Sequence, residues 1–241
     1  MSTTGTYSFN PAIADLVLDA FDRLQIRPAA ITQDHMASAL RSTNLLQVRW
    51  SNRGINLWAV DEQTILVNTG QYIYPITTTT ANITDNGTVA VLETWYRQNA
   101  GLPDQYDTFL QPISRTDWAQ LAIKNQPVAI PTSYWFDRLS PTPIIYLWGT
   151  PTFTSGPVEL HFFRMRQLQD SSIQNNVTPD IPYRFEEAWV ADLAVMLAIK
   201  WKPEIAKDLV AYAKEVWAEA IGEDRERVVL NLAPQISCYY Q

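Results

Sequence analysis

The chain has 241 residues, of which 46% are hydrophobic and 18% are charged, and its formal net charge is −7. That length is ample for one large core or two modest ones. The acidic balance, without a dense run of Lys and Arg, argues against a free-standing DNA-binding protein, whose affinity comes mostly from neutralising phosphates. Cys238 is the only cysteine, which excludes an intrachain disulfide.

The N-terminal part of the chain predicts a polar segment and two helices. Residues 1–9 contain neither a basic region nor an apolar run, so we expect no signal peptide and a chain that is made in a cytoplasm. Asn10 and Pro11 predict a helix start, and apolar residues recur at helical spacing from Ile13 to Leu24. Thr32 is expected to cap a second helix that runs through Trp50 and stops at Arg53-Gly54.

Past Gly54 the hydrophobic period changes to that of strands. Seven short runs are rich in β-branched and aromatic residues and are bounded by turn-forming residues. They are residues 57–60, 64–67, 71–76, 88–97, 132–138, 143–150 and 157–166. Asp85-Asn86-Gly87 signals a tight turn, and Ser114 is expected to cap a short helix near Arg115–Ile123. The pattern predicts a small β-sandwich or barrel.

Two consecutive helices follow from Pro182, and the first is apolar nearly all round, which predicts burial on several sides. Six charges within or next to it argue against a membrane span, because charges in hydrocarbon are costly. They are Arg184, Glu186, Glu187, Asp192, Lys200 and Lys202. Pro203 is expected in the first turn of the second helix. The apolar stripe of that helix is Ile205, Leu209, Tyr212, Val216 and Ala220.

These elements predict an α+β protein. The N- and C-terminal helices, in residues 1–54 and 182–232, are expected to form one discontinuous helical bundle, because the first two helices cannot bury their apolar stripes alone. A small β-sandwich or barrel domain, residues 55–181, is inserted between them. Residues 233–241 form a C-terminal arm, interpreted either as a frayed terminus or as a segment that docks on a partner.

No sequence motif has catalytic strength. The chain lacks a glycine-rich phosphate loop, G-x-S-x-G and H-E-x-x-H. His35 and His161 have no neighbouring ligand pattern and are expected as surface or strand histidines rather than metal ligands. Cys238 has no base beside it. We therefore expect no catalytic, cofactor-binding or metal-binding residue.

The carboxylates have structural interpretations. Asp15, Asp19 and Asp22 share one face of the first helix, which we expect to be solvated. Asp192, in the most apolar helix, is expected to pair with an Arg or to lie at a subunit contact, with a raised pKa as the alternative. Glu186 and Glu187 lie in a first helical turn, where the helix dipole stabilises negative charge.

Four tryptophans in the predicted strands leave two interpretations open. They are Trp58, Trp95, Trp135 and Trp148. They could form a platform that binds sugars or stacks on bases, or they could fill the core. Strand alternation permits either face to be buried, and core packing is favoured.

Three groups of segments together resemble a known family, the head-to-tail adaptors of short-tailed bacteriophages, also called tail accessory or head-completion proteins. They span nearly the whole chain. The first is L-V-L-D-A-F-D-R-L-Q-I (16–26) with R-W-S-N-R-G-I-N-L-W (49–58). The second is P-I-S-R-T-D-W-A-Q-L-A (112–122) with residues 131–138 and 143–151. The third is L-H-F-F-R-M-R-Q-L-Q-D (160–170) with residues 181–200.

The resemblance implies a structural virion protein at the head–tail junction, made in the host bacterium. It implies a helical bundle in a ring of about twelve copies bound to the portal protein, with tail nozzle or tail fibre components as further partners. It also implies a C-terminal arm that reaches into the portal, here from about Val228 to Gln241. The candidate contact residues are Val228, Val229, Leu230, Leu232, Ile236, Tyr239 and Tyr240.

In such a ring DNA passes during ejection without specific binding. We hypothesise that Asp and Glu of the bundle line the channel, since an acidic lumen repels phosphate across about 8 Å at physiological salt. The sequence does not identify the channel-lining residues. Some members of the family have been proposed to degrade peptidoglycan, but no residue pair of this chain can be assigned to that activity.

Two other functions remain open. One is a carbohydrate-binding or peptidoglycan-degrading tail protein that uses the aromatic residues of the β domain. The other is an α+β domain that joins no ring. No cofactor and no membrane is expected in any of them.

Overall fold

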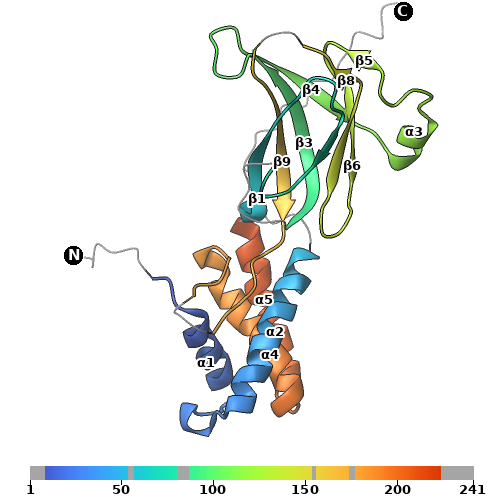
Figure 1. Ribbon diagram of the computed structural model, residues 1–241. Coiled ribbons are helices and arrows are strands. Elements are labelled where there is room, and N and C mark those ends of the chain that lie inside the picture. Colours follow the sequence, from blue (N-terminus) through green and yellow to red (C-terminus); the bar gives the residue numbers. More distant parts are fainter. Residues whose placement is uncertain (1–8, 54–56, 81–86, 154–155, 174–176, 224–241) are drawn as a thin grey trace, which may run out of the picture. The chain divides into compact units, whose positions relative to one another are not determined.

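The computed structural model describes residues 9–53, 57–80, 87–153, 156–173 and 177–223 (Figure 1). The protein is mixed α+β and divides into two compact units. A helical unit comprises residues 1–42 and 182–241, and a β unit comprises residues 43–181. The division falls inside a helix, between Ser42 and Thr43. Within the described ranges no helix is long and apolar enough to cross a membrane.

The helical unit is centred on α4 (Glu186–Trp201), against which α1 (Ile13–Arg23) and α5 (Ala206–Glu223) pack. The first part of α2 (Gln33–Ser51) also belongs to this unit. Eleven of the sixteen residues of α4 are buried, which confirms the prediction of a helix covered on several sides. Alanines at many α4 positions allow the neighbouring helices to approach closely, because a methyl group adds little bulk.

Helix ends differ from the predictions at two places. Asn10 does not cap α1: the chain stays extended through Ala12, and the helix begins at Ile13, its first buried residue. Pro203 does not lie in the first turn of α5 but in the preceding turn, where its carbonyl accepts from the Ala206 amide at 3.3 Å. The prediction for Thr32 is confirmed, since its hydroxyl accepts from the His35 amide at 3.4 Å.

The β unit contains a curled seven-stranded sheet in the order β1-β9-β3-β4-β6-β7-β2 (Figure 1). All neighbours pair antiparallel except β4 and β6, which pair parallel. The strands are β1 (Val60–Leu66), β2 (Ile73–Pro75), β3 (Thr88–Gln98), β4 (Tyr106–Pro112), β6 (Ser133–Asp137), β7 (Ile144–Trp148) and β9 (Val158–Arg166). A separate pair joins β5 (Pro127–Val128) to β8 (Thr150–Pro151).

One face of the curled sheet encloses the β unit's core. Its members alternate along the strands, as a half-buried sheet requires. They are Ile65, Val67, Tyr74, Ile76, Tyr96, Leu110, Tyr134, Ile145, Leu147, Val158, Leu160 and Phe162. The other residues of the same strands therefore form an outer face, on which the aromatic and charged clusters described below lie.

Short elements complete the β unit. Helix α3 (Arg115–Gln120) begins with a full capping box, in which the Ser114 hydroxyl accepts from the Asp117 amide at 3.1 Å, as predicted. Residues 57–59, predicted as strand, form a 3-10 turn instead. Strand β4 was not predicted, because only Leu110 of its seven residues is buried and the apolar signal is weak. Asp85 and Asn86 of the predicted turn lie outside the described residues.

Candidate functional site

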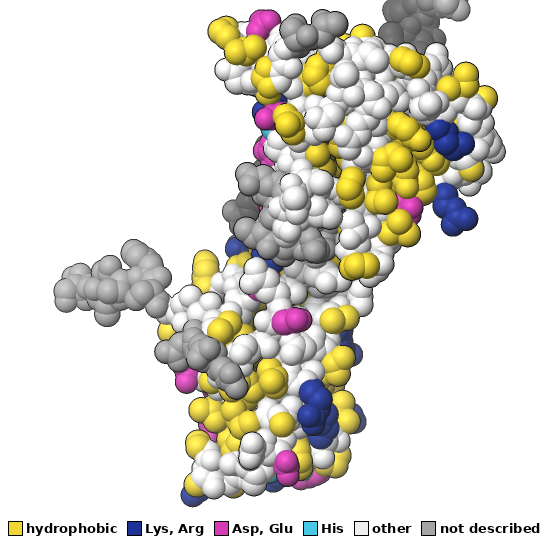
Figure 2. Space-filling view, viewed as in Figure 1, with side chains coloured by type: hydrophobic (Ala, Val, Ile, Leu, Met, Phe, Trp, Pro, Cys, Tyr) yellow, Lys and Arg dark blue, Asp and Glu magenta, His cyan; other side chains and the backbone are white. Residues whose placement is uncertain are grey.

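The arm residues inferred from the family resemblance lie outside the described residues. They are Val228, Val229, Leu230, Leu232, Ile236, Tyr239 and Tyr240. The surfaces that the structure describes are therefore the basis for a functional assignment. Figure 2 shows hydrophobic side chains gathered at two places, over the helical unit and on the β unit near α3 and β6.

A groove of about 930 Å³ lies in the helical unit where α1 and α4 begin. Its lining combines apolar side chains with four carboxylates. The lining residues are Phe9, Pro11, Asp15, Leu16, Asp19, Tyr183, Glu186, Glu187 and Val190. Phe9 and Tyr183 are 79% and 77% exposed, which is unusual for large aromatic side chains. The groove therefore offers both apolar area and negative charge.

Two of the four carboxylates are already paired inside the unit. Arg23 Nη2 donates to Asp19 at 3.1 Å and to Glu187 at 3.0 Å, and the Tyr212 hydroxyl donates to Glu187. Burial alone would raise the pKa of Glu187, but the hydrogen bonds from Tyr212 and Arg23 outweigh burial and lower that pKa. These contacts connect α1, α4 and α5 at one edge of the groove.

Glu186 differs from its neighbour. It is only 7% exposed, and the described residues give it no hydrogen-bond or ion-pair partner. Burial raises its pKa above the ordinary value of 4.5. Its oxygens are not among the fully buried polar atoms that lack a partner, so the carboxylate opens into the groove, where a cation from outside the chain can reach it.

The opposite end of α4 presents the reverse charge. Ile199 is 65% exposed and Trp201 is 38% exposed, with its ring 4.2 Å from that of His35. Lys200 Nζ donates to Ser42 Oγ at 2.7 Å and to Ser38 Oγ at 3.1 Å. Burial lowers the pKa of Lys200, and the nearby Arg41 lowers it further. Together with Lys202, this end of the helix is both cationic and apolar.

On the outer face of the sheet, His161 of β9 lies between two carboxylates. Its Nδ1 is 2.9 Å from Glu62 and its Nε2 is 3.0 Å from Glu159. The ring stacks on Trp95 at 5.5 Å. Each ring nitrogen therefore has a carboxylate within hydrogen-bonding distance. His161 is thus a strand histidine, as predicted, and it is buried.

A second aromatic cluster lies on the outer face near α3. Trp135 of β6 and Tyr146 of β7 are a cross-strand pair with ring centroids 4.9 Å apart. Trp118 of α3 stacks on Trp135 at 5.8 Å. Trp135 and Tyr146 are both half-buried, and their strand neighbours Tyr134 and Leu147 enter the core instead.

The prediction of core packing for the four strand tryptophans is therefore wrong. None of Trp58, Trp95, Trp135 and Trp148 belongs to the buried core of the β unit, and all four are half-buried. Neither composition nor spacing decides which of two alternating apolar sets faces inward, because the face depends on how the sheet curls.

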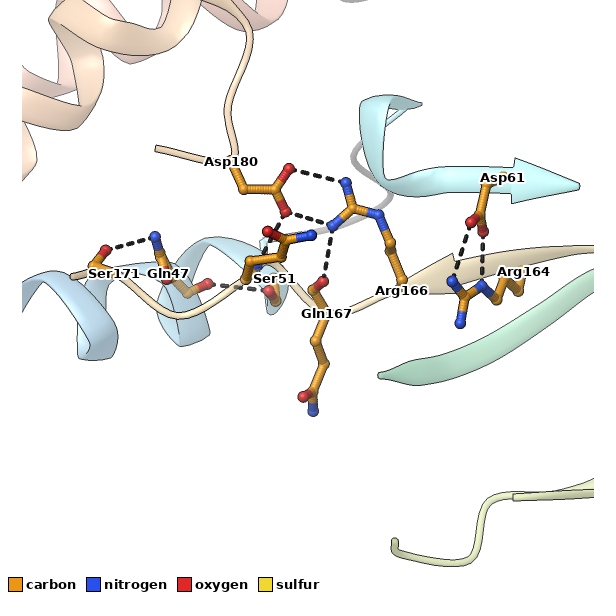
Figure 3. A network of polar contacts seen from close by, with 9 residues as sticks. Gln47, Ser51, Asp61, Arg164, Arg166, Gln167, Ser171 and Asp180 are labelled. Carbon is orange, nitrogen blue, oxygen red and sulfur yellow. Dashed lines mark hydrogen bonds and ion pairs between the residues drawn. The ribbon is translucent and has the colours of Figure 1, made fainter. Parts of the chain in front are cut away.

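A polar network fixes the end of β9 within the β unit (Figure 3). Arg164 is 1% exposed; its Nε donates to Asp61 at 2.8 Å and its Nη1 to Thr88 at 3.0 Å. Gln47 of α2 donates to the Ser171 hydroxyl at 2.7 Å. Asp61 and Thr88 thus supply acceptors for the buried Arg164 guanidinium, which indicates a structural role.

The structure thus brings together some of the residues that the sequence singled out. Asp15 and Asp19 meet Glu186 and Glu187 around the groove, whereas Asp22 is exposed and outside its lining. Asp192 is buried in α4. Sequence reasoning missed the groove itself and the exposure of Tyr183. Among the described residues no group of three or more His, Cys, Asp and Glu could hold a metal ion.

Comparison with known proteins gives no functional assignment, so the assignment rests on the surfaces described above. No family model matches the chain, and no curated protein matches it.

Proposed function

We propose that this chain is a head-to-tail adaptor of a short-tailed bacteriophage, one subunit of a portal-bound ring that joins head to tail and forms part of the DNA channel. The observation that carries the proposal is the exposure of large apolar side chains on the helical unit. They are Leu18, Tyr183, Ile199, Trp201, Tyr212 and Ile221, between 36% and 77% exposed. Tyr183 lies at one end of α4, and Ile199 and Trp201 lie at the other. Exposed apolar surfaces of this kind are typical of proteins that bind another protein.

Helix α5 adds support for a surface that is incomplete in the single chain. Its predicted apolar stripe is only partly covered: Ala220 is buried, whereas Ile205, Leu209 and Val216 are half-buried and Tyr212 is 41% exposed. An amphipathic helix with much of its apolar face exposed gains stability when another subunit covers that face. In the proposed arrangement the terminal helices form the bundle of the ring subunit and the β unit is a small inserted barrel.

The acidic excess of the helical unit supports the part of the proposal in which DNA passes through the ring without being bound. The described residues of the helical unit contain twelve Asp and Glu against eight Lys and Arg. We propose that some of these carboxylates line the channel, where they repel the phosphate backbone. The channel-lining residues are not assigned.

In this proposal the partners are the portal, neighbouring copies and tail nozzle or fibre components, and the chain resides in the virion. The test is native mass spectrometry of the purified full chain, alone and with the portal ring of the same phage. The expected result is a complex with a fixed, ring-like number of copies per portal. A chain that remains monomeric and ignores the portal would overturn the proposal.

The half-buried pair Trp135 and Tyr146 favours one alternative, a carbohydrate-binding or peptidoglycan-degrading tail protein. Stacked aromatic rings on an outer sheet face suit the apolar face of a sugar ring. Calorimetric titration with soluble peptidoglycan fragments tests it. Binding that is lost in a folded Trp135→Ala variant would support this alternative, and absence of binding by the unmodified chain would exclude it.

A further inference from the structure

The two ends of α4 are complementary to each other. The N-terminal end borders the groove, with the exposed rings of Phe9 and Tyr183 and the unpaired carboxylates Asp15 and Glu186. The C-terminal end carries exposed Ile199 and Trp201 with Lys200 and Lys202. One end therefore offers negative charge among apolar walls, and the other offers positive charge among apolar side chains. We call the second surface the basic patch.

Glu186 shows that the groove is more than an acidic surface. It lines the groove, is more than nine-tenths buried and has no partner among the described residues. The only cation beside the groove, among the described residues that contact its carboxylates, is Arg23, and Arg23 is engaged by Asp19 and Glu187. A cation that enters from outside would satisfy Glu186 and would be desolvated by the surrounding aromatic rings.

We propose that the groove of one copy receives the basic patch of a second copy, so that the chain associates head to tail through the two ends of α4. This inference rests on the proposed function, for which it names the lateral contact of the ring. The two surfaces are different, so an open assembly of any number of copies has one free groove and one free patch until the ring closes. Trp201 and Ile199 enter the groove as apolar anchors, and Lys202 approaches Glu186 and Asp15.

The helix geometry allows both surfaces to be used at once. A helix of sixteen residues is about 24 Å long, so its two ends lie far enough apart for two different neighbours to bind. Each contact needs only residues from the helical unit, whose described parts form one compact unit. A single rigid helix therefore fixes the relation between successive copies.

The test uses charge reversal in the full-length chain and native mass spectrometry. Asp15→Lys reverses an exposed groove charge and is therefore expected to fold, and Lys202→Glu reverses a patch charge. Each variant alone is expected to associate at least tenfold more weakly than the unmodified chain. Mixed in equal amounts, the two variants are expected to associate again, because the Lys groove of one accepts the Glu patch of the other. Circular dichroism confirms that each variant is folded.

The matched controls are Asp22→Lys, exposed on α1 but outside the groove, and Lys214→Glu, exposed on α5. Both are expected to associate as the unmodified chain does. If the unmodified chain forms rings on the portal that Asp15→Lys and Lys202→Glu leave unchanged, this inference is wrong and the proposed function stands. If the unmodified chain stays monomeric with and without portal, both are wrong. Weakened association of each variant without recovery in the mixture also overturns the pairing of groove with patch.

Discussion

Arg166 at the end of β9 and Asp180 form a two-pronged ion pair, in which Nη2 donates to Oδ1 at 2.9 Å and Nη1 contacts Oδ2 (Figure 3). The same carboxylate accepts from the Gln169 amide at 3.0 Å. Both side chains are less than one fifth exposed. Asp180 therefore holds the segment after β9 close to the end of that strand within the β unit.

Asp180→Asn is expected to lower the free energy of unfolding by about 1–3 kcal/mol, because it weakens a charge-assisted pair and leaves the Arg166 charge without its counterion. Urea unfolding followed by tryptophan fluorescence measures the change. Asp170→Asn is the control, since Asp170 is exposed in the same segment and is expected to change stability by at most about 0.5 kcal/mol. Equal effects of the two substitutions would contradict the structural role of Asp180.

Asp61→Asn is expected to destabilise the β unit by about 3 kcal/mol, because it removes the counterion of the buried Arg164 guanidinium. Asp107→Asn is the matched control on the same sheet. The pair of Asp107 with Arg97 has a similar length, 2.7 Å, but is more exposed, so its loss is expected to change stability by about 1 kcal/mol or less. If urea titrations show that Asp107→Asn lowers the free energy of unfolding as much as Asp61→Asn or more, the idea is wrong.

Glu186→Gln is expected to raise the Tm of the single chain at neutral pH by about 1–3 °C. Burial raises the pKa of Glu186, so the folded protein binds this proton more tightly than the unfolded chain does. Ionisation of Glu186 therefore lowers the stability of the folded protein, and this loss is complete above the folded-state pKa. The loss shrinks as the pH falls through that pKa and is gone below the ordinary pKa of 4.5. The Tm gap between variant and unmodified chain should narrow over that fall in pH.

The control for that measurement is Asp15→Asn, an exposed carboxylate of the same groove, which should change Tm little at any pH. Both substitutions are made in chains kept dilute, so that association does not contribute to stability. If the difference in Tm between Glu186→Gln and the unmodified chain stays constant from neutral to acid pH, the charge of Glu186 is not the cause of that difference.

Two neighbouring residues of β6 test which sheet face is the core. Tyr134→Ala is expected to cost about 3–5 kcal/mol, because Tyr134 is 2% exposed in the core. Trp135→Ala is expected to cost about 1–2 kcal/mol, since its half-buried ring contacts Trp118 and Tyr146 on the outer face. Chemical denaturation of both variants gives the comparison. A larger loss for Trp135→Ala would reverse the assignment of the faces.

Deletion of Asn231–Gln241 is expected to leave the stability of the fold unchanged, because the apolar stripes of the predicted helices end before residue 231. It is expected to weaken attachment to the portal, if the arm is the contact that the family resemblance implies. Co-sedimentation with portal rings measures attachment, and thermal unfolding measures stability. Unchanged attachment would remove the role of Ile236, Tyr239 and Tyr240.

The sequence by itself determined the local elements. Helical periodicity located α1, α2, α4 and α5, and short-range hydrogen bonding by Thr32 and Ser114 set two helix starts, because a side-chain cap needs only residues three positions away. Strand β4 was not predicted from the sequence, because six of its seven residues are not buried and apolar and polar residues do not alternate along it. The mixed α+β class follows from these local signals.

Only the tertiary structure determined which surfaces are exposed and available for binding. Glu186 was expected in a first helical turn, and it lies there, but its burial without a partner depends on α1, which comes from more than 160 residues earlier in the chain. The outward position of Trp135 depends likewise on the curl of a sheet assembled from distant strands. Burial is a sum over non-local neighbours, so periodicity predicts that a face exists and only packing determines what covers it.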